Sequence, residues 1–228
     1  MAPNLSKLSA TCCVALLALA APACAQQPAL PRPVLVTSST ETDPQALAWL
    51  TDDGRKSLAG ALAQEKAGTI HAFVFAAVPS ADAWAFRSTS KATDFLSVDD
   101  LARAALQTCQ FFAKIPCYII SINGQDARDQ YGGYPMQPNL LAGQRGRFDP
   151  ARIPFVTSSD QVSAAAYANQ TGPRAFVVTP SDYWLWRTGK TEFDAIASAY
   201  ADCQKGAAGQ TCVLYAVDDQ VVFEPSHN

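Results

Sequence analysis

Residues 82–87 read Asp-Ala-Trp-Ala-Phe-Arg, and residues 182–187 read Asp-Tyr-Trp-Leu-Trp-Arg. The pattern Asp-x-Trp-x-aromatic-Arg therefore occurs twice, and further matches follow in the same order around both motifs. They are Ala72-Phe73-Val74 with Ala175-Phe176-Val177, Ser97-x-x-Asp100 with Thr191-x-x-Asp194, Ala105-x-x-x-Cys109 with Ala199-x-x-x-Cys203, and Cys117 to Gln125 with Cys212 to Gln220. Ordered self-similarity of this kind is typical of an internal repeat, so we predict a tandem duplication.

Hydrophobic pattern and turn residues predict the same five elements in each copy. Helices over 57–66 and 160–169 end at Gly68 and Gly172, because glycine readily takes the positive φ of a helix end. Strands are predicted at 71–78, 84–89 and 117–122, and again at 174–179, 183–188 and 212–223. The predicted fold is α+β, built from tandem duplicated α-β-β-α-β units, each with a sheet covered by a helix.

The second helix of each copy is the clearest predicted element. Ser97 and Thr191 can each accept a bond from the amide three residues on, where an aspartate can return it as in a capping box. Apolar residues then recur at helical spacing and predict one buried stripe. In the first copy these are Leu101, Ala105, Cys109 and Phe112.

The tryptophan motif places two aromatic residues on one face of a strand in each copy. These are Trp84 and Phe86, and then Trp184 and Trp186. We expect them to fill the core under the cysteine-bearing helix, and the alternative is an aromatic platform for a sugar or a partner protein. Arg87 and Arg187 fall on the opposite face, where they can pair with an acid or serve as contacts.

The first 25 residues have the pattern of a cleavable signal peptide. Lys7 precedes an apolar run over 12–21, which is shorter than the ~20 residues of a membrane-spanning helix. Ala23-Cys24-Ala25 then forms a small-x-small cleavage signal before Gln26. The alternative interpretations of this segment are a membrane anchor, a core helix, or the signal sequence of a lipoprotein acylated at Cys24. We therefore predict a periplasmic or extracellular protein with no transmembrane segment after cleavage.

Composition limits the classes of partner. The mature chain of 203 residues carries 16 Lys and Arg against 20 Asp and Glu, a net charge of −4. Nucleic-acid binding depends on neutralising phosphates with basic side chains, so this balance argues against it. It argues more weakly against anionic membrane surfaces. A protein or a glycan remains as the expected partner.

Four cysteines remain after cleavage, and an even number in an exported chain indicates disulfides. They allow three pairings. The duplication favours bonds within each copy, Cys109–Cys117 and Cys203–Cys212, because one cysteine ends a helix and the other begins the next strand. The competing arrangement pairs cysteines across copies. Each short closed loop would contribute about 2–3 kcal/mol in the chain-entropy model.

The sequence contains no evident catalytic constellation. Of the two histidines, His71 begins a strand and His227 lies next to the C-terminus, so we predict neither a histidine-based catalytic site nor a metal site. The adjacent carboxylates Asp99-Asp100 and Asp218-Asp219 have ordinary explanations in a helix first turn and a hairpin turn. No glycine-rich phosphate loop follows a strand. We predict no cofactor.

The connection over 125–158 is long for a structureless link and is the predicted binding segment. Tyrosine and arginine are favoured at interface hot spots, and functional residues concentrate on loops. The candidate contacts are Arg128, Tyr131, Tyr134, Arg145 and Arg147. The predicted organisation is a signal peptide at 1–25, a lead with a short helix at 26–54, copies at 55–124 and 159–223 joined by 125–158, and a tail at 224–228.

The unit Trp84, Ala105-x-x-x-Cys109, Cys117, repeated as Trp184, Ala199-x-x-x-Cys203, Cys212, resembles small exported bacterial domains of unknown function. The resemblance covers 55–124 and 159–223, and the usual glycine after the tryptophan is missing from both copies. It implies an exported, disulfide-bonded domain and no particular reaction. We expect a non-enzymatic binding or interaction protein. The alternatives are an envelope-polymer hydrolase using a carboxylate pair and an inhibitor of a secreted enzyme.

Overall fold

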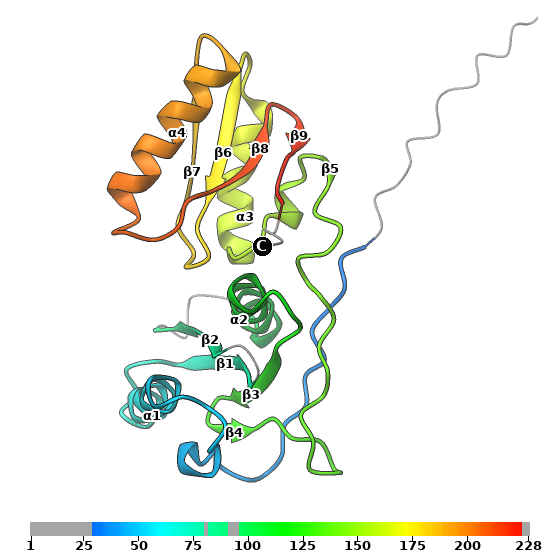
Figure 1. The fold of residues 1–228 in the computed structure, drawn as a ribbon, viewed down its shortest axis with the longest axis vertical. Helices are drawn as coiled ribbons and strands as arrows, with labels where there is room; N and C mark the ends of the chain where they lie inside the picture. The colour runs from blue at the N-terminus through cyan, green and yellow to red at the C-terminus, as the bar shows by residue number, and fades with distance from the viewer. Residues whose placement is uncertain (1–28, 80–81, 91–95, 225–228) are drawn as a thin grey trace, which may run out of the picture.

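The computed structural model describes residues 29–79, 82–90 and 96–224, so the predicted signal peptide and His227 lie outside the described residues. The described residues form two antiparallel sheets and four α-helices, which confirms the predicted α+β class (Figure 1). No helix in the described part of the chain has both the length and the apolar character needed to cross a membrane.

The first sheet has the strand order β2-β1-β3-β4 and is covered on both faces. Its strands are β1 (Ala72–Val78), β2 (Ala83–Thr89), β3 (Tyr118–Ile122) and β4 (Gln125–Asp126). Because successive side chains of a strand point to opposite faces, Phe73 and Phe75 pack towards α1 (Asp52–Lys66), whereas Val74 packs towards α2 (Val98–Ala113). The 3-10 helix η1 (Pro44–Ala46) precedes α1.

The second sheet has the order β5-β9-β8-β6-β7. Its strands are β5 (Gly146–Arg147), β6 (Arg174–Val178), β7 (Trp184–Thr188), β8 (Val213–Val217) and β9 (Gln220–Val221). Phe176 belongs to the core on the side of α3 (Ser158–Ala164), and Ala175 to the core under α4 (Glu192–Gly206). Two 3-10 helices flank α3, namely η2 (Pro150–Arg152) and η3 (Ala165–Asn169).

Helix α2 is the central element of the molecule. It lies between the first sheet and the end of the second half at which α3 begins (Figure 1). Eleven of its 16 residues are buried, against three of the 15 residues of α4. The two cysteine-bearing helices therefore differ in their surroundings, since α2 is an inner helix and α4 keeps an exposed outer side.

The helix caps are as predicted, and the element ends differ in part. Ser97 accepts a hydrogen bond from the Asp100 amide, and Thr191 forms a full capping box with Asp194. The helix predicted at 57–66 begins earlier, at Asp52, and the one predicted at 160–169 is α3 followed by η3. The strand predicted at 212–223 is divided into β8 and β9, because Asp218 takes a φ of +48° and turns the chain.

The aromatic pairs lie on the face opposite to the one predicted. Trp84 and Phe86 pack on the α1 side of the first sheet, and Trp184 and Trp186 pack on the α3 side of the second. The core under α2 is instead rich in small residues, including Ala76, Ala83, Ala85, Ala102 and Ala105. Small side chains let the helix approach the sheet, so the large rings are accommodated on the other face.

The predicted apolar stripe of α2 is wrong at one residue, which is exposed instead of buried. Leu101, Ala105 and Cys109 are buried as predicted, whereas Phe112 is 54% exposed. Phe112 lies in the last turn of the helix, where Lys114 takes a φ of +62° and turns the chain away. The stripe continues instead through Ala113, four residues after Cys109, which is buried in the same core as Leu101 and Ala105.

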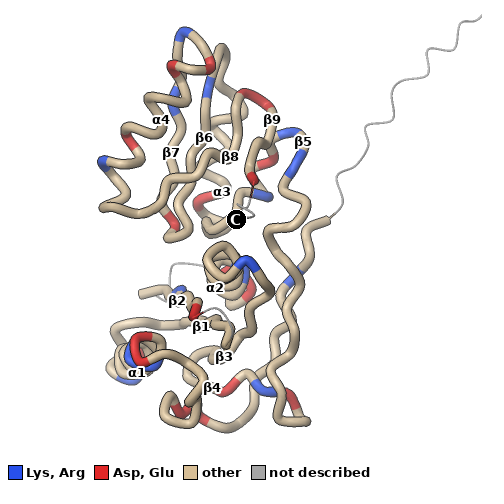
Figure 2. The backbone as a smooth tube through the Cα atoms, viewed as in Figure 1, with Lys and Arg blue, Asp and Glu red and all other residues tan. Residues whose placement is uncertain are grey.

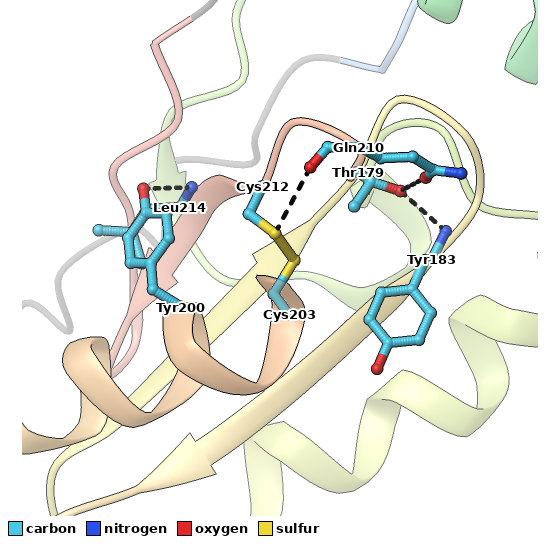
Figure 3. Close-up of a disulfide and its surroundings, with 7 residues drawn as sticks. All are labelled: Thr179, Tyr183, Tyr200, Cys203, Gln210, Cys212 and Leu214. Atoms are coloured by element: carbon cyan, nitrogen blue, oxygen red, sulfur yellow. Dashed lines mark hydrogen bonds between the residues drawn. A yellow bond between two sulfur atoms is a disulfide. The ribbon is translucent and has the colours of Figure 1, made fainter. Parts of the chain in front are cut away.

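Both predicted disulfides are confirmed. Cys109–Cys117 and Cys203–Cys212 each join the last turns of a helix to the start of the next strand, with Cα atoms 6.2 Å apart. Figure 3 shows the second bridge at the end of α4, beside the Tyr200 hydroxyl, which accepts from the Leu214 amide at 3.2 Å. The two bridges differ in exposure, because Cys109 and Cys117 are both fully buried and Cys212 is partly exposed.

Replacing both cysteines of a bridge by serine is expected to lower the free energy of unfolding by about 2–3 kcal/mol for Cys203–Cys212. The loss should be larger for Cys109–Cys117, because two serine hydroxyls would then be buried among apolar side chains. Guanidinium chloride unfolding followed by tryptophan fluorescence measures both values. An equal or smaller loss for the buried pair would contradict this account.

Candidate functional site

The structure divides the five predicted contact residues between the two ends of the connection. Arg128, Tyr131 and Tyr134 follow β4 of the first sheet, whereas Arg147 is part of β5 at the edge of the second sheet and Arg145 immediately precedes β5 (Figure 1). Tyr131 is 86% exposed. The connection therefore does not gather these side chains into one surface.

Arg128 and Tyr134 belong to a structural cluster around a buried carboxylate. Asp126 is 2% exposed and accepts from Arg128 Nε at 2.9 Å, and this bond raises the pKa of the Arg128 guanidinium. Burial raises the pKa of the Tyr134 hydroxyl to about 12. The Tyr134 ring meets the Trp49 ring edge-on, with centroids 6.3 Å apart. These contacts fix the start of the connection against the first half.

Arg147 lies in a second ion-pair cluster. Its guanidinium is 3.4 Å from Asp219, which also pairs with the largely buried Arg174. The Arg174 guanidinium in turn lies 5.2 Å from the centre of the Tyr167 ring. Asp219 belongs to the adjacent carboxylates Asp218-Asp219, and its two arginine partners give it a structural role.

The other carboxylate pair is also engaged within the fold. Asp100 accepts from Ser158 Oγ at 3.0 Å and lies 3.6 Å from the Arg103 guanidinium, whereas Asp99 is exposed. Figure 2 shows acidic and basic residues interspersed over both halves of the molecule. Among the described residues, no group of three or more His, Cys, Asp or Glu side chains is arranged to hold a metal ion.

Acids and bases from the two halves meet where α2 contacts the second half. Arg87 and Thr108 both donate to the Pro180 carbonyl, with Thr108 Oγ1 at 2.5 Å. Asp182 lies near Arg87 and Arg103, and burial raises its pKa to about 6, against the opposing attraction of Arg87. One of its carboxylate oxygens, Oδ1, is buried without a hydrogen-bond partner. This cluster is enclosed between packed elements.

An open hollow lies in the first half of the molecule. It has a volume of about 740 Å³ and lies between the start of α1 and the start of β2. We call it the first-unit groove. It is lined by Ala48, Trp49, Leu50, Thr51, Asp52, Asp53, Arg55, Lys56, Asp82 and Trp84. Trp84 is held by stacking on Phe75, with centroids 5.8 Å apart and an interplanar angle of 9°.

The groove combines aromatic and charged side chains, which suits recognition of a polar macromolecule. Asp52 pairs with Arg55, and Asp53 lies 3.7 Å from Lys56. Asp82 is exposed and forms no ion pair among the described residues. The sequence reasoning missed this site, although Trp49 followed by a capped helix start with two aspartates could have pointed to it.

Comparison with known proteins does not identify the chain. No family model, no curated protein and no solved structure matches it. Its function must therefore be inferred from its own residues and their arrangement.

The buried carboxyl of Asp182 predicts a pH dependence of stability. Its folded pKa of about 6 lies above the ordinary value of 3.8, so the folded protein binds more protons between these values and loses stability as the pH rises through them. The loss is at most about 3 kcal/mol. Asp182→Asn removes it, so the variant should gain stability relative to the parent protein between pH 4 and pH 6, as measured by urea unfolding.

Asp202→Asn is the matched control. The pKa of exposed Asp202 is lowered by its hydrogen bond to Arg187, so its contribution is lost as the pH falls and the control should show the opposite trend. The assignment to Asp182 would be refuted if Asp182→Asn and the parent protein had parallel stability profiles.

Proposed function

We propose that the mature chain is an exported binding protein made of two copies of one structural unit, and that the first-unit groove receives a protein partner. One observation carries this proposal. In the second copy, the surface that corresponds to the groove is covered by α2, whereas in the first copy it is open.

Ring stacking supports the duplication. Phe75 stacks on Trp84 at 5.8 Å and 9°, and Phe176 stacks on Trp184 at 5.7 Å and 6°. Phe75 also pairs with Phe86 across the hairpin, as Phe176 pairs with Trp186. The structural counterpart of Phe176 is therefore Phe75, two residues beyond the sequence match to Phe73.

The hairpin turns support it independently. Asn123 has a φ of +49° and its side chain accepts from the Phe73 amide at 2.8 Å. Asp218 has a φ of +48° and accepts from the Arg174 amide at 2.9 Å. Both copies also carry a bulge between their first and third strands, so the agreement extends to an irregularity that the fold class does not require.

The correspondence also extends to the segment before each first helix. Asp43 caps η1 and Asp149 caps η2, and each is followed by proline. The same number of residues then leads to Thr51 and Thr157, which cap α1 and α3. This spacing supports a match of Trp49 with Phe155, and with it a match of the first-unit groove with the surface under α2.

Export is supported by two features. The first 25 residues have the composition of a signal peptide, and the two disulfides agree with an oxidising extracellular or periplasmic location. The resemblance to exported bacterial domains points the same way. The mature protein would therefore meet its partner outside the cytoplasm.

Binding is favoured over the two alternatives. A hydrolase needs an accessible carboxylate pair, but Asp100 accepts a hydrogen bond from Ser158, and Asp182 is largely buried where α2 meets the second half. An inhibitor that presents the connection would need its contact residues together, and they are held at opposite ends of that segment. Binding in the first-unit groove requires neither a carboxylate pair nor a joint surface on the connection.

A pull-down of partners from envelope extract tests the proposal. The bait is the mature protein, compared with a variant carrying Asp82→Asn and Lys56→Glu in the groove. Both side chains are exposed, so the fold should survive, and recovery of a specific partner should fall about tenfold through loss of charge complementarity.

Glu192→Gln with Lys205→Glu on the outer side of α4 is the matched control and should recover the partner fully. Tyr131→Ala tests the connection without deleting it, since Gln137 and Leu140 in that segment are buried. Loss of the partner with Tyr131→Ala but not with the groove variant would move the site to the connection and refute the proposal.

A further inference from the structure

Helix α2 shows what kind of element fits the surface that corresponds to the groove. Gln107 Oε1 accepts from the Phe155 amide at 2.8 Å, and Arg103 Nη2 donates to the Val156 carbonyl at 2.7 Å. The Phe111 ring meets the Phe155 ring edge-on, with centroids 5.5 Å apart. Arg103, Gln107 and Phe111 are spaced four residues apart, so they lie on one face of the helix.

The first copy offers counterparts of the amide and ring contacts, whereas the counterpart of the carbonyl contact is already occupied. Trp49 stands in the place of Phe155 with a half-buried ring, and within the described residues its amide donates no hydrogen bond. Leu50 stands in the place of Val156, and its carbonyl accepts from the Arg55 guanidinium of the same unit. An aromatic surface and an unused amide therefore lie side by side in the groove.

The backbone at the two sites differs in the sign of one φ angle. Phe155 has a φ of +70°, whereas Trp49 is not among the residues with positive φ. Gln107 bonds directly to the amide of Phe155. A helix seated on the first copy is therefore expected to turn the amide of Trp49 in the same way.

Charge also favours a helix with an arginine on this face. Asp182 lies near Arg87 and Arg103 in the second copy, and its counterpart Asp82 lines the open groove without an ion pair among the described residues. An incoming arginine would therefore find an exposed carboxylate. Asp52 and Asp53 already have basic partners within α1.

A second copy of the chain does not supply the required helix. Matching Cys203 with Cys109 places Ala197, Ala201 and Lys205 of α4 where α2 has Arg103, Gln107 and Phe111. The outer side of α4 therefore lacks the arginine, the glutamine and the aromatic ring. The helix α2 of a second copy is not free to bind in the groove, because it is buried within its own chain.

We propose that the first-unit groove seats an α-helix of a different protein, one that carries Arg-x-x-x-Gln-x-x-x-aromatic on its docking face. This inference rests on the proposed binding function and specifies the partner's secondary structure and side chains. The peptide amide of Trp49 and the carboxylate of Asp82 are its polar anchors, and the Trp49 ring is its apolar contact.

A synthetic peptide with the sequence of 97–113, carrying Cys109→Ser, is the probe. It is titrated into the ¹⁵N-labelled mature protein, and the indole N–H signals of the four tryptophans are followed. We expect shifts at Trp49 and Trp84 and none at Trp184 and Trp186. Replacing the peptide's arginine by alanine, or using Asp82→Asn protein, should weaken binding about tenfold, whereas Glu192→Gln protein should bind normally.

The outcomes separate this inference from the proposed function. Absence of shifts at Trp49 and Trp84, or shifts at Trp184 and Trp186 instead, would overturn the helix assignment. If the peptide fails to bind but the groove variant still loses its partner in the pull-down, the helix assignment is wrong and the proposed binding function stands. A concentration-dependent dimer of the mature protein in native mass spectrometry, abolished by Asp82→Asn, would assign the groove to a second copy and also overturn the inference.

Discussion

The burial of α2 on both of its sides is the constraint on which the rest of the structure depends. One side packs on the first sheet through small apolar residues such as Ala102 and Ala105. The other side is polar, and burying a polar group is costly unless it finds a partner. Backbone groups of the second half provide the hydrogen-bond partners of Gln107, Arg103 and Thr108. These bonds fix how the two halves sit together.

This arrangement makes the two halves of the molecule unequal. The second half provides backbone partners for the polar side of α2, whereas the groove of the first half is open. On the far side of the second half, α4 presents a polar outer side that includes Asp202 and Lys205.

Features set by neighbouring residues could be predicted from the sequence. The cap at Thr191 and the spacing of Cys203 and Cys212 are local, and both are found as expected. Features set by contacts between distant segments could not. Gln107 and Arg103 lie outside the predicted apolar stripe of their helix, and nothing in the sequence pattern indicates that the second half packs against them. The aromatic face of each sheet was misplaced for the same reason, because alternation gives two faces without saying which helix covers which.

The contact between α2 and the second half is specific rather than strong. The same physical limits apply to a helix that binds in the first-unit groove. Asp182 Oδ1 stays buried without a hydrogen bond, and buried ionic groups of this kind contribute little net stability. In the intact chain the connection helps to hold the halves together, since Gln110 of α2 donates to the Pro138 carbonyl and accepts from the Leu140 amide. A separate protein seated on the groove would have no such link. Its affinity would therefore rest on the ring of Trp49 and on the charge of Asp82, which is the physical basis for a reversible contact.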